Sequence, residues 1–165
     1  MNVEELVNII ADAFRGVEQP IEITLHVAEA HDNYDGENDE KHRQKDFVGA
    51  WESIPEEHIA SCQHALSFLD KIGMRYYLPA YMVWTLKNLN NDKIDLVHAL
   101  YSLDNSPNDP ELAAYHKERF SLFTLEQMEA CALFVKFCAE DEHDYTDAYF
   151  ARKRLDRYWA QYIRT

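Results

Sequence analysis

The sequence predicts an all-α fold: a single compact helical domain of six or seven helices around a buried central helix. Only 4 of the 165 residues are Gly and 5 are Pro, too few for the many tight turns of an all-β fold. Hydrophobic residues make up 47% of the chain and aromatic residues 13%, which indicates a packed core rather than disorder. No repeat or linker divides the chain, so residues 1–165 are predicted to form one domain.

The first predicted helix starts at a capping box. Asn2 and Glu5 have the required three-residue spacing, and Gly16 and Pro20 end the segment. The apolar residues at helical spacing are Val3, Leu6, Val7, Ile10 and Phe14. Residues 21–30 fit either a strand or a short helix, and we favour a helix that starts at Thr24.

Residues 29–46 form an acidic, glycine-containing insertion. Its acidic residues are Glu29, Asp32, Asp35, Glu37, Asp39, Glu40 and Asp46. Burying several carboxylates would cost far more free energy than the single Tyr34 could return. The insertion is therefore predicted to be a solvated loop or mobile arm that can be shortened with little loss of stability.

The central helix is predicted at about Pro79 to Leu89. A proline suits the first turn of a helix, where its missing N–H would have no partner. The segment that follows is apolar on every side, which indicates a helix surrounded by others. The predicted core residues here are Tyr77, Leu78, Ala80, Val83 and Trp84.

Other helices are placed by their start signals. Ser53, three residues before Glu56, predicts a helix start, and the apolar stripe after it is Ile59, Cys62, Leu66 and Leu69. Asp109 and Pro110 predict a helix that runs to about Arg119. Capping-box residues Thr124 and Gln127 open the next helix, and the last one is predicted from Thr146.

The charge of the chain restricts its partners. With 30 acidic and 16 basic residues, the net charge is −14, which repels nucleic acids and anionic membranes and attracts basic proteins or cations. An acidic composition that only keeps the protein in solution would explain this net charge equally well. Met1 to Glu5 show no signal sequence, and no apolar run reaches the roughly 20 residues needed to span a bilayer. The three cysteines are odd in number and lie in apolar helical patterns. These observations predict a cytoplasmic protein with reduced thiols.

Several catalytic motifs are missing from the sequence. The four glycines, at positions 16, 36, 49 and 73, leave no G-x-G-x-x-G or phosphate-binding loop. No G-x-S-x-G motif is present, although a Ser-His-Asp or Cys-His arrangement formed only in space stays open. The sequence thus gives no positive sign of catalysis and favours a protein without enzymatic activity or cofactor.

A metal site is the main alternative. The insertion cannot be a calcium loop, because the two end positions would be His31 and His42 instead of oxygen ligands. A transition-metal site is chemically open. Its candidate ligands are His26, His31, Asp32, Asp35 and His42. A second candidate is a zinc site at His58 and Cys62, which lie four residues apart. The sequence shows no evident second pair of ligands to complete it.

The chain resembles a family of uncharacterised bacterial domains. The resemblance rests on Arg75-Tyr76-Tyr77-Leu78-Pro79-Ala80-Tyr81-Met82, an aromatic-Leu-Pro-Ala-aromatic motif preceded by Phe68-Leu69-Asp70-Lys71-Ile72-Gly73. It extends to Ile23-Thr24-Leu25, Trp51 and Phe123-Thr124-Leu125-Glu126-Gln127. The resemblance implies a small bacterial domain and supplies no activity and no catalytic residues.

Two functional hypotheses follow. The first is a non-enzymatic interaction module, similar to acidic immunity-type proteins, that binds a basic protein partner or itself. Its candidate contact residues are Asp32, Asp35, Glu37, Asp39 and Glu40. The second is a small metal-dependent enzyme with a divalent transition metal at His26, His31, Asp32 and Asp35.

Overall fold

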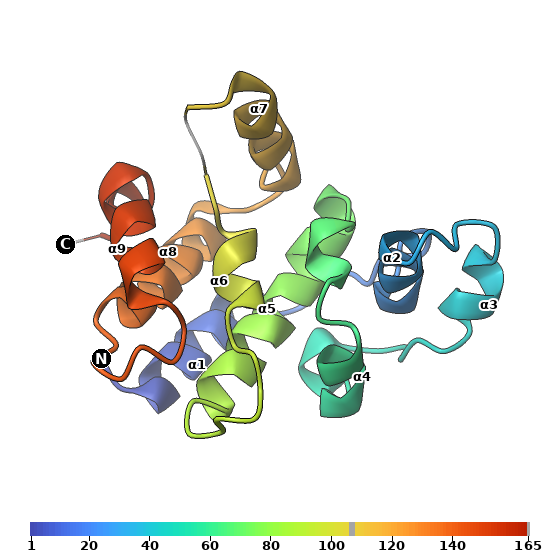
Figure 1. Cartoon of the computed structure of the whole chain (residues 1–165), viewed down its shortest axis with the longest axis horizontal. Coiled ribbons are helices and arrows are strands. Elements are labelled where there is room, and N and C mark those ends of the chain that lie inside the picture. The colour runs from blue at the N-terminus through green and yellow to red at the C-terminus, as the bar shows by residue number, and fades with distance from the viewer. Residues whose placement is uncertain (106–107, 165) are drawn as a thin grey trace.

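The computed structural model describes residues 1–105 and 108–164, and these residues form an all-helical domain (Figure 1). They contain nine α-helices, six of which have seven residues or more, together with three short 3-10 helices. The elements are α1 (Val3–Ala13), α2 (Leu25–Asp32), α3 (Asp39–Arg43), η1 (Trp51–Ser53), α4 (Glu56–Ser61), η2 (Ala65–Ser67), α5 (Lys71–Lys87), α6 (His98–Ser102), α7 (Pro110–Arg119), α8 (Leu125–Ala139), α9 (Ala148–Arg157) and η3 (Trp159–Tyr162). The predicted all-α fold is confirmed.

Helix α5 lies at the centre of the domain and contacts α1, α4, α6 and α7 (Figure 1). Its buried residues include Tyr77, Leu78, Ala80 and Trp84, as predicted, whereas Val83 is only partly buried. From Met74 to Leu86 all residues except Arg75 and Val83 are buried, which explains why this part of the helix is almost entirely apolar.

The predicted start of the central helix at Pro79 is wrong. The helix begins two turns earlier, where the Asp70 side chain accepts a hydrogen bond from the Gly73 N–H at 2.8 Å. Pro79 lies inside the helix and has no N–H to donate to the carbonyl of Arg75. Burial of the surrounding residues stabilises the helix on both sides of the proline and outweighs this lost hydrogen bond.

Helix α8 packs between α1 and α9 and completes the core on the side of both termini (Figure 1). Two buried tryptophans fasten loops to this core. Trp51 Nε1 donates to the Phe14 carbonyl at 3.0 Å, and Trp159 Nε1 donates to the Leu103 carbonyl at 2.8 Å. Both indole N–H groups therefore have the partner that burial requires.

Most predicted helix starts are confirmed. Asn2 and Thr124 each form a complete capping box, and α7 begins at Pro110 after its N-cap, Asp109. Thr24 directly precedes α2, so the helical reading of residues 21–30 is also confirmed.

Two further predicted helix starts need correction. Ser53 belongs to η1 and does not cap a helix; α4 begins at Glu56 after Pro55. Because α4 ends at Ser61, the expected apolar stripe is divided among α4, η2 and the loop before α5. The last helix begins at Ala148, since its N-cap is Asp147 rather than Thr146.

The acidic insertion is more ordered than predicted. Residues 29–32 complete α2, and residues 39–43 form α3. We call residues 33–46 the acidic arm; it lies at the opposite end of the domain from α8 and α9 (Figure 1). Arg43 Nη2 donates to the Glu22 carbonyl at 2.8 Å and so ties the arm to the segment before α2. Most residues of the arm are exposed, as expected, with Tyr34 98% exposed.

Within the described residues, none of the helices has both the length and the apolar character needed to cross a bilayer.

Candidate functional site

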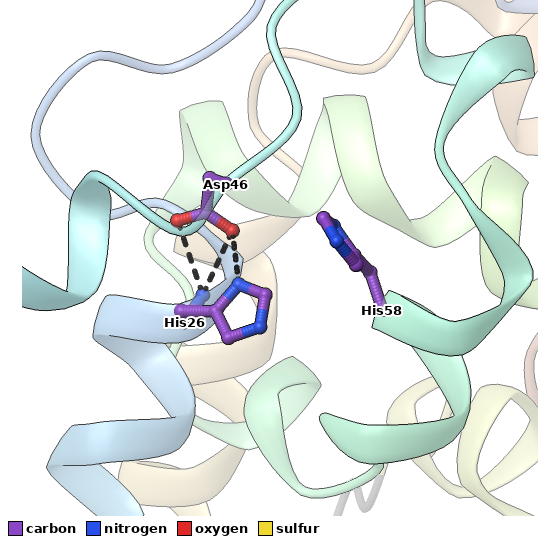
Figure 2. Close-up of side chains that lie close together, drawn as sticks. All are labelled: His26, Asp46 and His58. Atoms are coloured by element: carbon purple, nitrogen blue, oxygen red, sulfur yellow. Dashed lines mark hydrogen bonds and ion pairs between the residues drawn. The ribbon is translucent and has the colours of Figure 1, made fainter.

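Three side chains from separate elements converge beside the acidic arm (Figure 2). His26 belongs to α2, Asp46 ends the acidic arm and His58 belongs to α4. One ligand atom of each residue lies within 4.8 Å of the other two. Among the residues that the structure describes, this is the one group of three or more metal-ligating side chains that meets this distance.

Asp46 organises the cluster through two sets of hydrogen bonds. Its carboxylate accepts from His26 Nδ1 at 2.6 Å and from the His26 backbone N–H at 3.1 and 3.3 Å (Figure 2). The N-cap residue of α2, Thr24, makes no side-chain capping bond within the described chain. Asp46 thus takes the capping role from a distant position, at the helix end where a negative charge is favourable.

The burial of Asp46 distinguishes it from the other acidic residues of the arm. Only 4% of its side-chain surface is exposed, compared with 17% for His26. A carboxylate removed from water to this extent requires a cation or several donors around it. The His26 imidazole and backbone N–H supply this partner.

His58 closes the other side of the cluster. Its ring lies edge-on to the His26 ring, with the centroids 5.0 Å apart and the planes at 85°. Its Nδ1 atom is buried and has no hydrogen-bond partner among the described residues. Because buried polar atoms in native proteins are nearly always paired, this nitrogen is available for a ligand.

The electrostatics of the site centre on His26. The hydrogen bond to Asp46 is the main cause that raises the pKa of His26 to about 9, the Cys62 thiol adds to the rise, and burial opposes it. In the absence of a metal ion, His26 is therefore protonated at neutral pH and forms an ion pair with Asp46.

The sequence left open a Cys-His arrangement formed only in space. The structure places such residue types near one another, in Cys62, His26 and Asp46. Cys62 is only 1% exposed and is the C-cap of α4. Reactive cysteines are partly exposed and are favoured at helix N-termini, whereas Cys62 is buried at the C-terminal end of its helix. The cluster is therefore better suited to hold a cation than to activate this thiol.

A cleft of about 360 Å³ adjoins the cluster. Its lining includes His26, Cys62, Asn33, Asp35 and His42. The cleft gives the His26 side of the cluster access to solvent-borne ions and small molecules.

Three of the four remaining predicted metal ligands form pairs outside the cluster. His31 Nε2 pairs with Asp39 at 2.8 Å, and His42 Nε2 pairs with Asp35 at 2.7 Å, which lowers the pKa of Asp35. Asp32 joins neither pair. Of the five predicted ligands, the structure thus brings only His26 into the cluster, and the proposed set of His26, His31, Asp32 and Asp35 does not form.

The sequence did not point to Asp46 as a candidate ligand and assigned His58 to a different candidate pair. One signal for Asp46 was present, because it is the acidic residue of the insertion that directly precedes the apolar Phe47 and Val48. Its position at the return to apolar sequence indicates a carboxylate next to the core rather than one in open solvent.

Comparison with known proteins gives a family but no activity. No curated protein and no solved structure matches the chain significantly. The family model described as "family of unknown function (DUF6714)" matches residues 2–163. The chain therefore belongs to this family of unknown function.

Proposed function

We propose that this chain binds one divalent transition metal ion of the zinc class at His26, Asp46 and His58. The observation that carries the proposal is the convergence of two imidazoles and one carboxylate from three separate elements. Imidazole-rich sets suit zinc and its neighbours, whereas calcium and magnesium prefer oxygen ligands alone.

The ligand number supports a small metal-dependent enzyme over a structural zinc protein. Structural zinc sites have four protein ligands, while catalytic sites have three and keep one position for water or substrate. The cleft beside His26 supports access to such a position.

Zinc titration of chelator-treated protein, followed by calorimetry, tests this proposal. We expect one zinc ion per chain and a higher melting temperature. His58→Gln should weaken zinc binding by about tenfold or more, because loss of even an outer-shell partner of a metal ligand costs about 10–100-fold in affinity. His31→Gln is the matched control, because His31 is paired with Asp39 outside the cluster.

Two results would reject the metal proposal. One is wild-type protein that takes up no zinc, cobalt, manganese or nickel at stoichiometric amounts. The other is a His58→Gln variant that binds zinc as tightly as wild type, since the ion would then lie elsewhere. His58 Nδ1 has no partner to lose among the described residues, so this variant should keep its fold.

A second candidate function, binding of a basic protein partner, is favoured by the net charge of −14. Of the proposed contact residues, Asp35 and Glu40 already pair with His42 and Arg43 of the arm, and Asp39 pairs with His31 of α2. Asp32 and Glu37 have no side-chain partner among the described residues, so they are the stronger contact candidates. Self-association through the same face would require the partner copy to supply cations.

Affinity capture from a native lysate at low and high salt tests the second candidate. Binding that depends on charge should weaken as salt increases. The double substitution Asp32→Asn and Glu37→Gln should release the captured protein, and Glu4→Gln, at the distant start of α1, is the control. Capture that is unchanged by salt and by the double substitution would argue against this function.

A further inference from the structure

A second concave site is lined by residues of α7, the start of α8 and the end of α9, which lie away from the acidic arm. Its volume is about 660 Å³, within the range of small-molecule sites. Its walls are mainly apolar and are formed by Phe120, Phe123, Leu125 and Met128. We call this site the C-terminal groove.

The wall of the groove is built from interlocked aromatic rings. Phe120 packs edge-on against Phe123 and Trp159, with centroid distances of 5.0 and 5.6 Å. Tyr158 packs edge-on against Trp159 at 5.0 Å, and its hydroxyl lies 3.1 Å from that of Tyr162. Such packing holds the groove in shape before any ligand arrives.

The charge of the groove is opposite to that of the molecule. Its described lining contains two cationic side chains, Lys117 and Arg157, and no carboxylate, although the whole chain has 30 acidic and 16 basic residues. Both cations are exposed, and neither forms an ion pair with another described residue. A lining that combines two cations with apolar side chains is complementary to an anion with an apolar body.

We propose that the C-terminal groove binds a small amphipathic anion, a carboxylate that carries an aromatic ring or a medium-length alkyl chain. The apolar body contacts Phe123, Leu125 and Met128, and burial of that surface supplies most of the affinity. The carboxylate lies near Lys117 and Arg157, which fix its orientation. This site uses none of the residues of the His26–Asp46–His58 cluster and is independent of the metal proposal.

Calorimetric titration with decanoate, below its micelle concentration, tests this inference. We expect one decanoate per chain. Two controls should each bind at least about tenfold more weakly than decanoate. Butyrate has the same charge and a shorter alkyl chain, and decylammonium has a similar alkyl chain and the opposite charge. The fluorescence of Trp159, which packs against the groove residues Phe120, Tyr158 and Tyr162, gives a second readout.

The variant Lys117→Gln/Arg157→Gln should lose about tenfold in decanoate affinity. Lys153→Gln is the control, because Lys153 lies over the Tyr149 ring and outside the groove lining. Decylammonium binding as tight as decanoate binding would overturn the proposal, as would a double variant with wild-type decanoate affinity. All three cations are exposed, so folding of these variants is not at risk.

Discussion

Asp46 connects the acidic arm to the helical core through one buried carboxylate. It caps α2 from a position 20 residues away in sequence and pairs with His26, so one side chain stabilises a helix end and a charged imidazole together. The carboxylates of two other His–Asp pairs are more exposed: the His42–Asp35 pair lies within the arm, and the His31–Asp39 pair joins α2 to the arm. Removal of Asp46 should therefore have effects that removal of Asp39 does not.

The stability of the metal-free protein should fall as pH rises from about 6.5 to about 9. The pKa of His26 is raised from 6.5 to about 9 in the folded state, so its contribution is complete below pH 6.5 and is lost as pH rises through 9. Urea unfolding at several pH values with a chelator present measures this loss. Asp46→Asn should cost about 1.5–3 kcal/mol at neutral pH and should remove the pH dependence in this window; an unchanged pH profile would contradict the pairing.

Zinc affinity should change with pH in the opposite direction. A bound ion must displace the proton of His26, so affinity should rise about tenfold per pH unit while that imidazole is protonated. With a pKa of about 9, the rise should continue through neutral pH. Titrations at three pH values between 6 and 8 check this slope, and a flat profile would mean that His26 is not a ligand.

Helix α5 depends on a start signal that lies well before its proline. The Asp70 side chain satisfies the Gly73 N–H in the first turn, and the buried residues that follow hold the helix in place. Gly73 permits this arrangement, because a Cβ atom there would lie 2.9 Å from Leu69 Cδ2 and 3.3 Å from the Ile23 carbonyl oxygen. The central helix is thus fixed at both its cap and its nearest contacts.

Asp70→Ala should lower the free energy of unfolding by about 1 kcal/mol, the usual cost of removing an N-cap side chain. Asp70→Asn or Asp70→Ser, which keep a side-chain acceptor, should recover most of the loss. Urea denaturation of the three variants measures this. Equal stability of Asp70→Ala and wild type would show that packing alone fixes the start of α5.

Trp84→Ala should cost about 3–5 kcal/mol, the range for removal of a large buried aromatic side chain. Trp84 is 4% exposed on the central helix, whereas the adjacent Val83 is only partly buried, so Val83→Ala should cost clearly less. Thermal and urea unfolding compare the two variants. An effect below about 1 kcal/mol for Trp84→Ala would contradict its place in the core.

At the scale of the whole molecule, the three cysteines differ in whether they border a cleft. All three are free and buried, but Cys62 borders the cleft beside His26, whereas Cys131 and Cys138 lie within α8. Burial raises the pKa of both α8 thiols, that of Cys138 to about 12. Neither α8 thiol is expected to be reactive while the core is closed.

Reaction with a thiol reagent under native conditions should modify Cys62 first. In a Cys62→Ser variant the two remaining thiols should react together and only as fast as the core opens. Absorbance at increasing urea concentrations follows both phases. Rapid modification of either remaining thiol without denaturant would show that α8 is less well enclosed than its burial indicates.

The sequence determined the features that depend on neighbours within one helical turn. The capping boxes at Asn2 and Thr124 and the start of α7 at Pro110 could be predicted because each is a contact between residues three or fewer positions apart. The strongly apolar sequence around Trp84 likewise predicted a buried central helix, because removal of apolar surface from water favours burial in any arrangement.

Only the tertiary structure decided where α5 begins and which residues form the site. Local rules place a proline at a helix start, but the packing around Pro79 stabilises helix on both sides of it. His26 could be predicted as a candidate ligand, whereas its grouping with Asp46 and His58 could not, because the three residues come from α2, the end of the acidic arm and α4. Spacing along the chain does not encode such a convergence, since it depends on how separate elements pack against one another.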